Sequence, residues 1–385
     1  MKKIMFIQNE AHVLGGIFQV NKTLGLEFYK QKYDVQIVSL RNNHKDDYEK
    51  TPFKQVVLNS HDRWEFTQRR DVLNAFKNYN KPLNSLKKYL IDYFNLKNDL
   101  KKLKDYILKE NPDYIIVSHY QVLAGIPKSF LKKVIYVQHS TFNLLYSDKK
   151  NFKVIKKYKN NIFGFAWLAK STKLIAEKTG FKNSYVIYNP VRFNCGKVAN
   201  VVKNKKLIAL TRFSPEKRIE LMLEIVNDVF KDKRFNEWSM ELYGSGELSK
   251  KSRDIITNNK KIRNMGVVND SMNVLLQSSC ILNTSIIEGY PLSIIEAYSC
   301  GVPAITFDFG EAAVEEVTNG YNGFVIEQNN VKKYKEKLIY LMSNLNELKK
   351  FGMNAKEDSK KYEPSEIAKN WINLFKEMDG QNEKS

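Results

Sequence analysis

Short apolar runs alternate with longer amphipathic segments along the whole chain. The apolar runs are bounded by turn residues, which is typical of buried strands. In the first half these runs cover residues 3–8, 34–40, 114–119, 134–139 and 185–190. In the second half they cover residues 207–213, 240–246, 262–268, 280–285 and 303–309. The alternation of strands with helices predicts an α/β fold with parallel sheets.

The amphipathic segments with the clearest helical spacing are residues 83–108, 216–230 and 331–348. In the first of them, leucines and other apolar residues recur every three or four positions, which is the spacing of one helix face. The strand-and-helix pattern occurs twice, so we expect two Rossmann-like domains.

Residues 189–205 contain proline, glycine and charges without periodicity, which predicts an interdomain linker. The first domain would then span residues 1–188 and the second residues 206–363, with a C-terminal helix over 364–379 that packs back on the first domain. Two such domains would face each other across a cleft. In open α/β sheets ligands bind beyond the carboxyl ends of the strands, so the loops there are the places to seek chemistry.

Composition limits the classes of protein to consider. The start of the chain has too few consecutive apolar residues for a signal peptide, and no apolar run approaches eighteen residues, so we expect a cytoplasmic protein. The three cysteines form no metal-binding pattern and are expected to be free thiols. The net charge of +21 belongs to the first half, where residues 1–190 hold 34 Lys and Arg against 16 Asp and Glu.

The segment from Asn283 to Gly310, "NTSIIEGYPLSIIEAYSCGVPAITFDFG", places Glu288 and Glu296 around a Gly-Tyr-Pro turn that opens a short helix. The free backbone N–H groups of a helix start can bind an anion, and we expect Gly289, Tyr290, Pro291 and Leu292 to border it. A carboxylate at Glu296 can accept two hydrogen bonds from the vicinal diol of a ribose. From spacing alone, a solvated helix face is the favoured explanation of the two glutamates.

This segment resembles the Glu-x7-Glu signature of the retaining glycosyltransferases of family 4, within the wider pattern "EGxPLxxxEAxxCGxPxI". "TRFSPEKRIELMLE", "ELYGSGEL" and "VIYNPV" match further parts of that family. The resemblance implies the GT-B fold, with two facing Rossmann-like domains, an acceptor-binding first domain and a donor-binding second domain. It implies hexosyl or N-acetylhexosaminyl transfer from a nucleotide diphosphate sugar, with a UDP-sugar favoured.

The resemblance assigns roles to four residues as the catalytic group: Glu288, Arg212, Lys217 and His139. Arg212 and Lys217 follow a strand at the place where a diphosphate would sit, and fixed cations there neutralise the charge of the departing nucleotide. Glu288 would position sugar hydroxyls, because the sequence offers no firm nucleophile. No Asp-x-Asp pair stands where a metal would be needed, so we expect a metal-independent enzyme without a cofactor.

Other positions at strand ends are weaker candidates. Gly15 and Gly16 follow the first strand, where the resemblance places them beside the acceptor and the donor phosphates respectively. His119 ends another strand and is a candidate for the acceptor pocket, although a lone histidine is usually structural. Gly244 and Gly246 lack the third glycine of a dinucleotide fingerprint and are expected to shape the pocket of the nucleotide base.

The basic first half fits an acidic partner. No motif indicates nucleic acid. Relatives of this type act on glycan, lipid-linked or phosphate-bearing polymer acceptors in surface polysaccharide or teichoic acid synthesis, so the charge would face such an acceptor or an anionic membrane. The lysines of residues 83–108 would meet the membrane, or else are simply solvated. A basic binding protein without turnover and a glycosyl phosphorylase are the alternatives, and the oligomeric state stays open.

Overall fold

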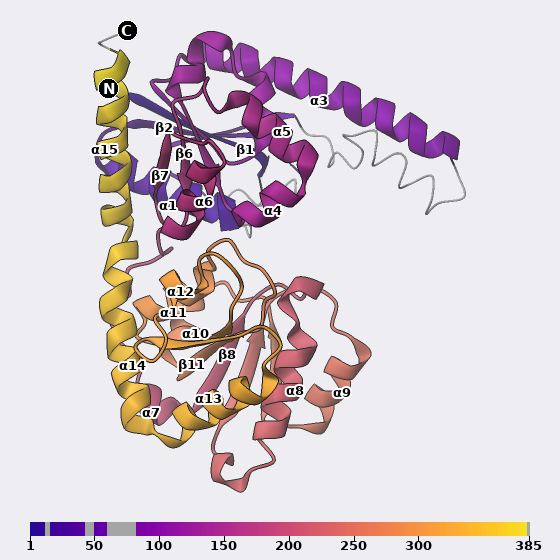
Figure 1. The fold of residues 1–385 in the computed structure, drawn as a ribbon, viewed down its shortest axis with the longest axis vertical. Coiled ribbons are helices and arrows are strands. Elements are labelled where there is room, and N and C mark those ends of the chain that lie inside the picture. Colours follow the sequence, from indigo (N-terminus) through magenta and orange to yellow (C-terminus); the bar gives the residue numbers. More distant parts are fainter. Residues whose placement is uncertain (12–15, 43–49, 60–81, 383–385) are drawn as a thin grey trace.

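The computed structural model describes residues 1–11, 16–42, 50–59 and 82–382, which form two α/β domains (Figure 1). The first domain is built on a parallel sheet of seven strands in the order β3-β2-β1-β4-β5-β6-β7. These strands are β1 (Lys3–Ala11), β2 (Asp34–Asn42), β3 (Lys54–Asn59), β4 (Tyr114–Val117), β5 (Val134–Gln138), β6 (Gly164–Trp167) and β7 (Ser184–Val186).

The second domain is built on a parallel sheet of six strands in the order β10-β9-β8-β11-β12-β13. Its strands are β8 (Lys206–Leu210), β9 (Ser239–Tyr243), β10 (Ile262–Gly266), β11 (Cys280–Asn283), β12 (Ala304–Phe307) and β13 (Gly323–Ile326). In both sheets the chain starts near the middle, moves outward and then returns to build the other side. The prediction of an α/β fold with two parallel-sheet domains in the GT-B arrangement is confirmed.

The helices connect and cover these strands. In the first domain they are α1 (Gly16–Lys30), α3 (Pro82–Glu110), α4 (Phe142–Ser147), α5 (Lys149–Tyr158) and α6 (Lys170–Lys178). In the second they are α7 (Val201–Asn204), α8 (Ile219–Val229), α9 (Lys250–Asn258), α10 (Ser271–Leu276), α11 (Leu292–Ser299), α12 (Ala313–Glu316), α13 (Val331–Ser343) and α14 (Leu345–Asp358). The last helix, α15 (Pro364–Asn382), follows α14.

Both faces of the first sheet are buried, which explains the continuous apolar runs of its strands. In β1, Ile4 and Phe6 pack on one side with α1, while Met5 and Ile7 pack on the other side with Leu103 of α3. Parallel sheets that carry helices on both faces need apolar residues at successive positions. The long helix α3 extends away from the body of the molecule at its N-terminal end (Figure 1).

The structure differs from the predicted elements in three strands that were not predicted and in the bounds of two helices. Strand β3 has six residues and strands β6 and β13 have four each; β3 and β13 lie at sheet edges. The helix expected over residues 216–230 begins only at Ile219, because Arg218 takes the left-handed conformation with a φ of 52°. The helix expected over residues 331–348 is split at Asn344, where α13 ends and α14 begins.

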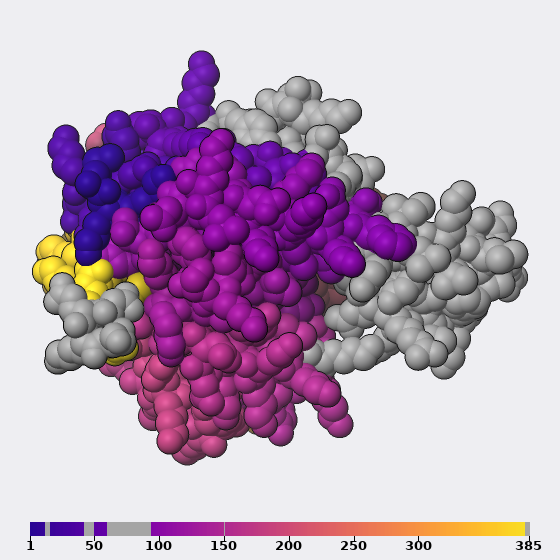
Figure 2. Space-filling view, turned by 90° about the horizontal axis from the view of Figure 1, so that it is seen from above, coloured from indigo at the N-terminus to yellow at the C-terminus, as the bar shows by residue number. Residues whose placement is uncertain are grey.

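The C-terminal helix α15 returns to the first domain. Its Phe375 ring stacks on Tyr114 of β4 with the ring centres 4.2 Å apart, and the Tyr114 hydroxyl donates to Asp379 at 2.7 Å. Lys2 also pairs with Asp379 at 2.5 Å. In the view from above, the end of this helix therefore lies beside the N-terminal residues (Figure 2).

Two glutamates of the second domain bind helix starts of the first domain. Glu311 accepts hydrogen bonds from the backbone N–H groups of Phe142 and Asn143 in α4, at 2.9 and 2.8 Å. Glu315 accepts one from the N–H of Lys170 in α6 at 2.7 Å. A carboxylate at a helix N-terminus satisfies free donors and complements the helix dipole. These bonds fix one domain against the other.

Within the described residues, no helix is long and apolar enough to cross a membrane. The three cysteines, Cys195, Cys280 and Cys300, are buried and free, as predicted.

Candidate active site

A cleft of about 1390 Å³ lies between the two domains. Its walls come from the carboxyl ends of strands in both sheets, including the residues that follow β1, β4 and β5 on one side and β8, β9 and β11 on the other. This is the position that the topology of two facing parallel sheets predicts for a ligand. The cleft therefore brings together loops that are far apart in the sequence.

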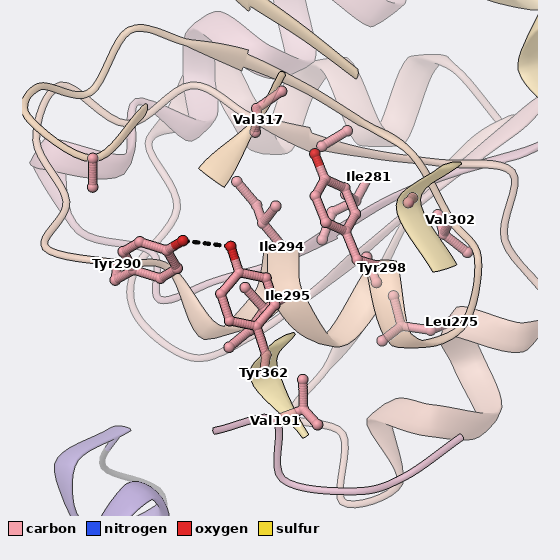
Figure 3. Packing of buried hydrophobic residues seen from close by; sticks show 14 of the residues in the cluster. Val191, Leu275, Ile281, Tyr290, Ile294, Ile295, Tyr298, Val302, Val317 and Tyr362 are labelled. Atoms are coloured by element: carbon pink, nitrogen blue, oxygen red, sulfur yellow. Dashed lines mark hydrogen bonds between the residues drawn. The ribbon is translucent and has the colours of Figure 1, made fainter. Parts of the chain in front are cut away.

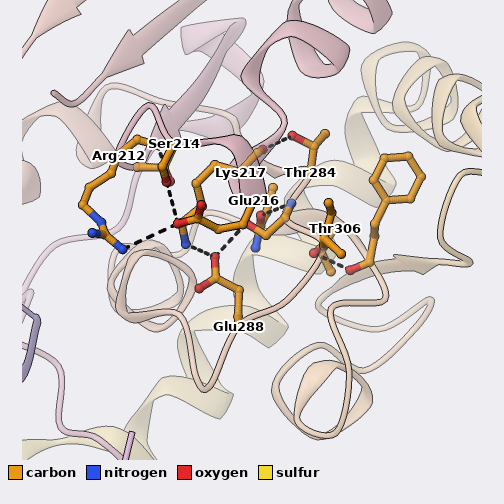
Figure 4. Close-up of polar contacts among 12 residues, drawn as sticks. Arg212, Ser214, Glu216, Lys217, Thr284, Glu288 and Thr306 are labelled. Carbon is orange, nitrogen blue, oxygen red and sulfur yellow. Dashed lines mark hydrogen bonds and ion pairs between the residues drawn. The ribbon is translucent and has the colours of Figure 1, made fainter. Parts of the chain in front are cut away.

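Lys217 and Glu288 form an ion pair on the second-domain wall of this cleft (Figure 4). The Ser285 hydroxyl donates to the same oxygen of Glu288 at 2.7 Å. The Thr284 hydroxyl donates to the backbone carbonyl of Lys217 at 2.8 Å, which ties the turn after β8 to the loop after β11. Only 12% of the Lys217 side chain is exposed, so its charge is held in place beside the carboxylate.

Arg212 lines the same wall but is held less firmly. Its side chain is 76% exposed, and it forms a long ion-pair contact of 3.7 Å with Glu216. The guanidinium is therefore free to turn toward an anion in the cleft. The two cations predicted for a diphosphate thus lie together but differ in mobility.

Glu296 lies on α11 at the floor of the cleft and is bound by an arginine from the segment after β7. Arg192 donates to both carboxylate oxygens, through Nε to Oε1 and through Nη2 to Oε2 at 2.8 Å. The Ser271 hydroxyl lies 3.0 Å from the same Nη2. Sequence reasoning missed Arg192. The position of Glu296 in an apolar helix could have indicated such a partner, because a buried carboxylate needs a cation or several hydrogen-bond donors.

Gly289 brings the two halves of the site into contact. A Cβ atom at this position would lie 2.0 Å from the backbone carbonyl oxygen of His139 and 2.8 Å from its carbonyl carbon. Glycine is required here because of space and not because of backbone conformation. The loop that carries Glu288 thereby touches the strand end that carries His139. Across the same cleft, Gly16 at the start of α1 faces Leu292 of α11.

His139 and His119 lie side by side on the first-domain wall and are both neutral near physiological pH. Burial lowers the pKa of His139 to about 3, with a further contribution from His119. Burial and the nearby charge of Arg41 lower the pKa of His119 to about 4. The His139 ring contacts the Ser118 hydroxyl at 3.3 Å, and the Nδ1 atom of His119 accepts from the backbone N–H of Asn9 at 3.4 Å.

The turn before α11 offers backbone donors. Within the described residues, the N–H groups of Gly289, Tyr290 and Leu292 donate to no other group. Pro291 is the N-cap of α11 and supplies no side-chain cap. The Tyr290 side chain points away from the cleft into the core, where its hydroxyl lies 2.5 Å from that of Tyr362 (Figure 3). Tyr290 can therefore offer a ligand its backbone but not its phenol.

Gly244 and Gly246 differ in their relation to the cleft. Gly244 lines it, whereas Gly246 is not among the lining residues. A Cβ at Gly244 would lie 1.7 Å from the backbone oxygen of Thr211, and one at Gly246 would lie 2.6 Å from that of Phe213. Both glycines also have positive φ values. Their main role is to let the loop after β9 approach the loop after β8. Gly15 lies outside the described residues.

No group of three or more His, Cys, Asp or Glu side chains that could hold a metal ion occurs in the described part of the chain. The charged groups that line the cleft are instead the cations of Arg41, Arg192, Arg212 and Lys217 and four carboxylates. The carboxylates are those of Glu10, Asp148, Glu288 and Glu296.

Comparison with known proteins shows similarity to one family in the second half of the chain. Residues 194–358 match the family model described as "Glycosyl transferases group 1". The matched residues cover most of the second domain. This domain includes the loops that carry Arg212, Lys217, Glu288 and Glu296.

Two curated relatives extend the similarity into the first domain. The chain is 29% identical over 252 residues to a poly(ribitol-phosphate) alpha-N-acetylglucosaminyltransferase of Staphylococcus aureus, which covers 63% of this chain and 50% of that protein. It is 27% identical over 303 residues to a poly(glycerol-phosphate) alpha-glucosyltransferase of Bacillus subtilis, with coverages of 76% and 43%. The chain thus spans about half the length of these relatives.

Solved structures share the fold. Staphylococcus aureus TarM, in complex with Fondaparinux, alpha-GlcNAc-glycerol and UDP, matches 97% of this chain and 100% of its own with a TM-score of 0.75 at 18% identity. Anabaena HepE in complex with UDP matches 98% of this chain and 100% of its own with a TM-score of 0.70 at 14% identity. At these identities the likeness establishes the two-domain architecture alone.

Proposed function

We propose that this protein is a retaining glycosyltransferase of family 4 that moves a hexosyl or N-acetylhexosaminyl group from a nucleotide diphosphate sugar to a glycan, lipid-linked or anionic polymer acceptor. The observation that carries the proposal is the convergence, in one interdomain cleft, of a Lys217–Glu288 pair, the buried Glu296 and unbonded backbone amides. These are the groups that a sugar, a ribose and a diphosphate require.

The second domain would bind the donor. In this arrangement Arg212 and Lys217 contact the diphosphate, and the N–H groups of Gly289, Tyr290 and Leu292 add donors at the start of α11. Departure of the nucleoside diphosphate moves an electron pair onto a phosphate oxygen. Cations and amides that are already in place stabilise that growing charge more than they stabilise the bound donor.

Glu288 would hold hydroxyl groups of the transferred sugar. In the structure its carboxylate is occupied by Lys217 and Ser285. A bound diphosphate competes for Lys217, and the freed lone pairs of Glu288 can then accept from the sugar. His139 lies across the contact with Gly289, and it would face the reacting carbon from the first-domain side. Its low pKa makes it a neutral hydrogen-bonding group, so it orients the sugar and does not add a charge.

The same-face reaction fits a site without a nucleophile of its own. The acceptor hydroxyl attacks the anomeric carbon as the bond to the diphosphate breaks, through an oxocarbenium-like state, and its proton passes to the leaving phosphate oxygen. Glu288 then acts by position and charge. In retaining hydrolases the corresponding carboxylate instead forms a covalent intermediate.

The donor is proposed to be a UDP-sugar. Two solved neighbours with this fold are described in complex with UDP. Glu296 would accept from the ribose hydroxyls, and Gly244 would border the base. The reaction is proposed to need no metal, because Arg212 and Lys217 supply the positive charge. Activity should therefore persist in EDTA, and complete loss that Mg²⁺ restores would contradict this part of the proposal.

The first domain would bind an acceptor that carries phosphate, as the names of the two curated relatives indicate for those proteins. Its surface offers two rows of lysines. One is on α3, where the exposed lysines lie opposite the buried Leu103 and Ile107. The other is on α5, which follows the cleft residue Asp148 and carries five lysines and no acidic residue. We propose that the protein works in the cytoplasm, at the inner membrane face where such acceptors are assembled.

The decisive experiment is a panel of nucleotide sugars, with donor hydrolysis and release of the nucleoside diphosphate as readouts. A glycosyltransferase hydrolyses its own donor slowly in the absence of acceptor. The Glu288→Gln variant should lose this reaction while it still binds the nucleotide. Binding without any turnover would favour a binding protein. Phosphate-dependent cleavage of a glycan with no response to nucleotide sugars would favour a phosphorylase.

A further inference from the structure

The pairing of Arg192 with Glu296 joins the segment that follows β7 to the floor of the donor side of the cleft. Both nitrogens of the guanidinium fork face the carboxylate, with the Nη2–Oε2 distance at 2.8 Å. The Ser271 hydroxyl lies between them, 3.0 Å from Nη2 and 3.4 Å from Oε2. The side chain of Glu296 is 1% exposed, whereas that of Arg192 is 35% exposed.

Burial makes this pairing necessary. A carboxylate that is removed from water without a partner is strongly destabilised and tends to take up a proton. An arginine that binds both oxygens supplies the partner and also fixes the plane of the carboxylate, because the guanidinium fork is rigid. Each oxygen has a second lone pair that the arginine does not use. The carboxylate of Glu296 is thus fixed in orientation, with acceptor capacity left for a ligand.

We propose that Arg192 is a positioning residue that sets the selectivity of this site for a ribose diol by fixing Glu296. The proposal rests on the proposed function, in which Glu296 accepts hydrogen bonds from the ribose hydroxyls. It assigns Arg192 an action through Glu296 and not on the diphosphate. Removal of Arg192 should then weaken binding of a ribonucleotide far more than binding of the matching deoxyribonucleotide.

The test compares dissociation constants for UDP and 2′-deoxy-UDP by calorimetry, with GDP and 2′-deoxy-GDP as a second pair. Loss of one hydrogen bond to a charged group raises a dissociation constant by about tenfold to a hundredfold. UDP should therefore bind more tightly than 2′-deoxy-UDP by this factor. The wild-type protein should show this preference. Arg192→Gln should reduce it to within a few-fold of unity, and Arg192→Lys should keep part of it, because lysine retains the charge but not the fork.

Two further variants separate positioning from a structural effect. Glu296→Gln should lose the preference by itself, and adding Arg192→Gln to it should cause no further loss, because the arginine acts through the carboxylate. This double variant also avoids an unpaired buried charge, so it remains informative if Arg192→Gln alone fails to fold. The matched control is Arg263→Gln, which breaks a 2.7 Å pair with the buried Glu241 in the same domain, outside the cleft lining. It should leave the preference unchanged.

The outcomes distinguish this inference from the function on which it rests. If the wild type prefers ribonucleotides and Arg192→Gln weakens both members of a pair equally, Arg192 acts on the diphosphate or on the fold, and the positioning role is overturned. If the wild type binds nucleotides without regard to the 2′-hydroxyl, the role of Glu296 fails and the inference fails with it. If no nucleoside diphosphate binds at all, the proposed function itself is overturned.

Discussion

Replacing Gly289 with alanine should disable the site without unfolding either domain. The added Cβ would lie 2.0 Å from the His139 carbonyl oxygen, and carbon–oxygen contacts in proteins settle at about 3.3–3.6 Å. The loop of Glu288 and the strand end of His139 must therefore separate by roughly 1.3 Å to reach that range. The obstructing atoms belong to the backbone on both sides, so no side-chain rotation can relieve the clash.

A misplacement of about 1 Å in an active site can lower the rate by about a hundredfold. We expect Gly289→Ala to reduce kcat/KM for donor hydrolysis by that order. Affinity for the nucleoside diphosphate should change less, because Arg212, Lys217 and Glu296 lie outside this loop and only the amides at the start of α11 move with it. Steady-state kinetics give the first quantity and calorimetry gives the second, while the melting temperature reports on the fold.

The control is Gly196→Ala. No atom lies within 4 Å of the Cβ position at Gly196, and its backbone is outside the left-handed region, so this variant should behave as wild type. Wild-type kcat/KM in Gly289→Ala would refute the reasoning, since it would mean that the contact between the domains is not needed to assemble the site. A melting temperature far below that of the control would show instead that the contact serves the fold.

Three further predictions concern charge. Lys217→Met and Arg212→Met should lower kcat more than they raise KM, because the charge these residues face grows as the nucleotide departs; a change in KM alone would contradict this. His119 and His139 have folded pKa values near 4 and 3, so stability should be highest above about pH 7 and fall as the pH drops toward 4, by about 2 kcal/mol per histidine between pH 8 and 5. Urea unfolding at several pH values measures the free energy of unfolding. Replacing both histidines with asparagine should make this free energy nearly independent of pH in the same range. A variant whose stability depends on pH as strongly as that of the parent would exclude the two histidines as the cause. Glutamine replacements on either lysine row should weaken binding to anionic vesicles or to a polyanionic acceptor at low salt and leave nucleotide affinity intact. A row whose replacement has no effect on this binding is excluded as the contact. The α3 row is Lys97, Lys101, Lys102 and Lys104, and the α5 row is Lys149, Lys153, Lys156 and Lys157.

Patterns along the chain were enough to predict the elements that are buried on both sides. The core strands of each sheet carry mainly apolar runs, and such runs have few alternatives in a parallel sheet. The sequence also located the loop of Glu288, because a turn, a proline and an apolar helix in that order constrain the local backbone. The edge strands β3 and β13 escaped prediction because β3 is only half-buried and β13 is only four residues long. A half-buried strand lacks a continuous apolar run, and a four-residue strand carries little periodic signal.

Which distant residues meet depends on the three-dimensional packing of the two domains. The partner of Glu296 is Arg192, 104 positions earlier, and nothing in the local sequence of either residue specifies the other. The contact of Gly289 with His139 likewise depends on how two independently folded sheets pack together, which Glu311 and Glu315 help to fix. Local patterns encode helices, strands and turns through side-chain periodicity. Contacts between domains depend on the shape and charge of completed surfaces, and these exist only once the domains have formed.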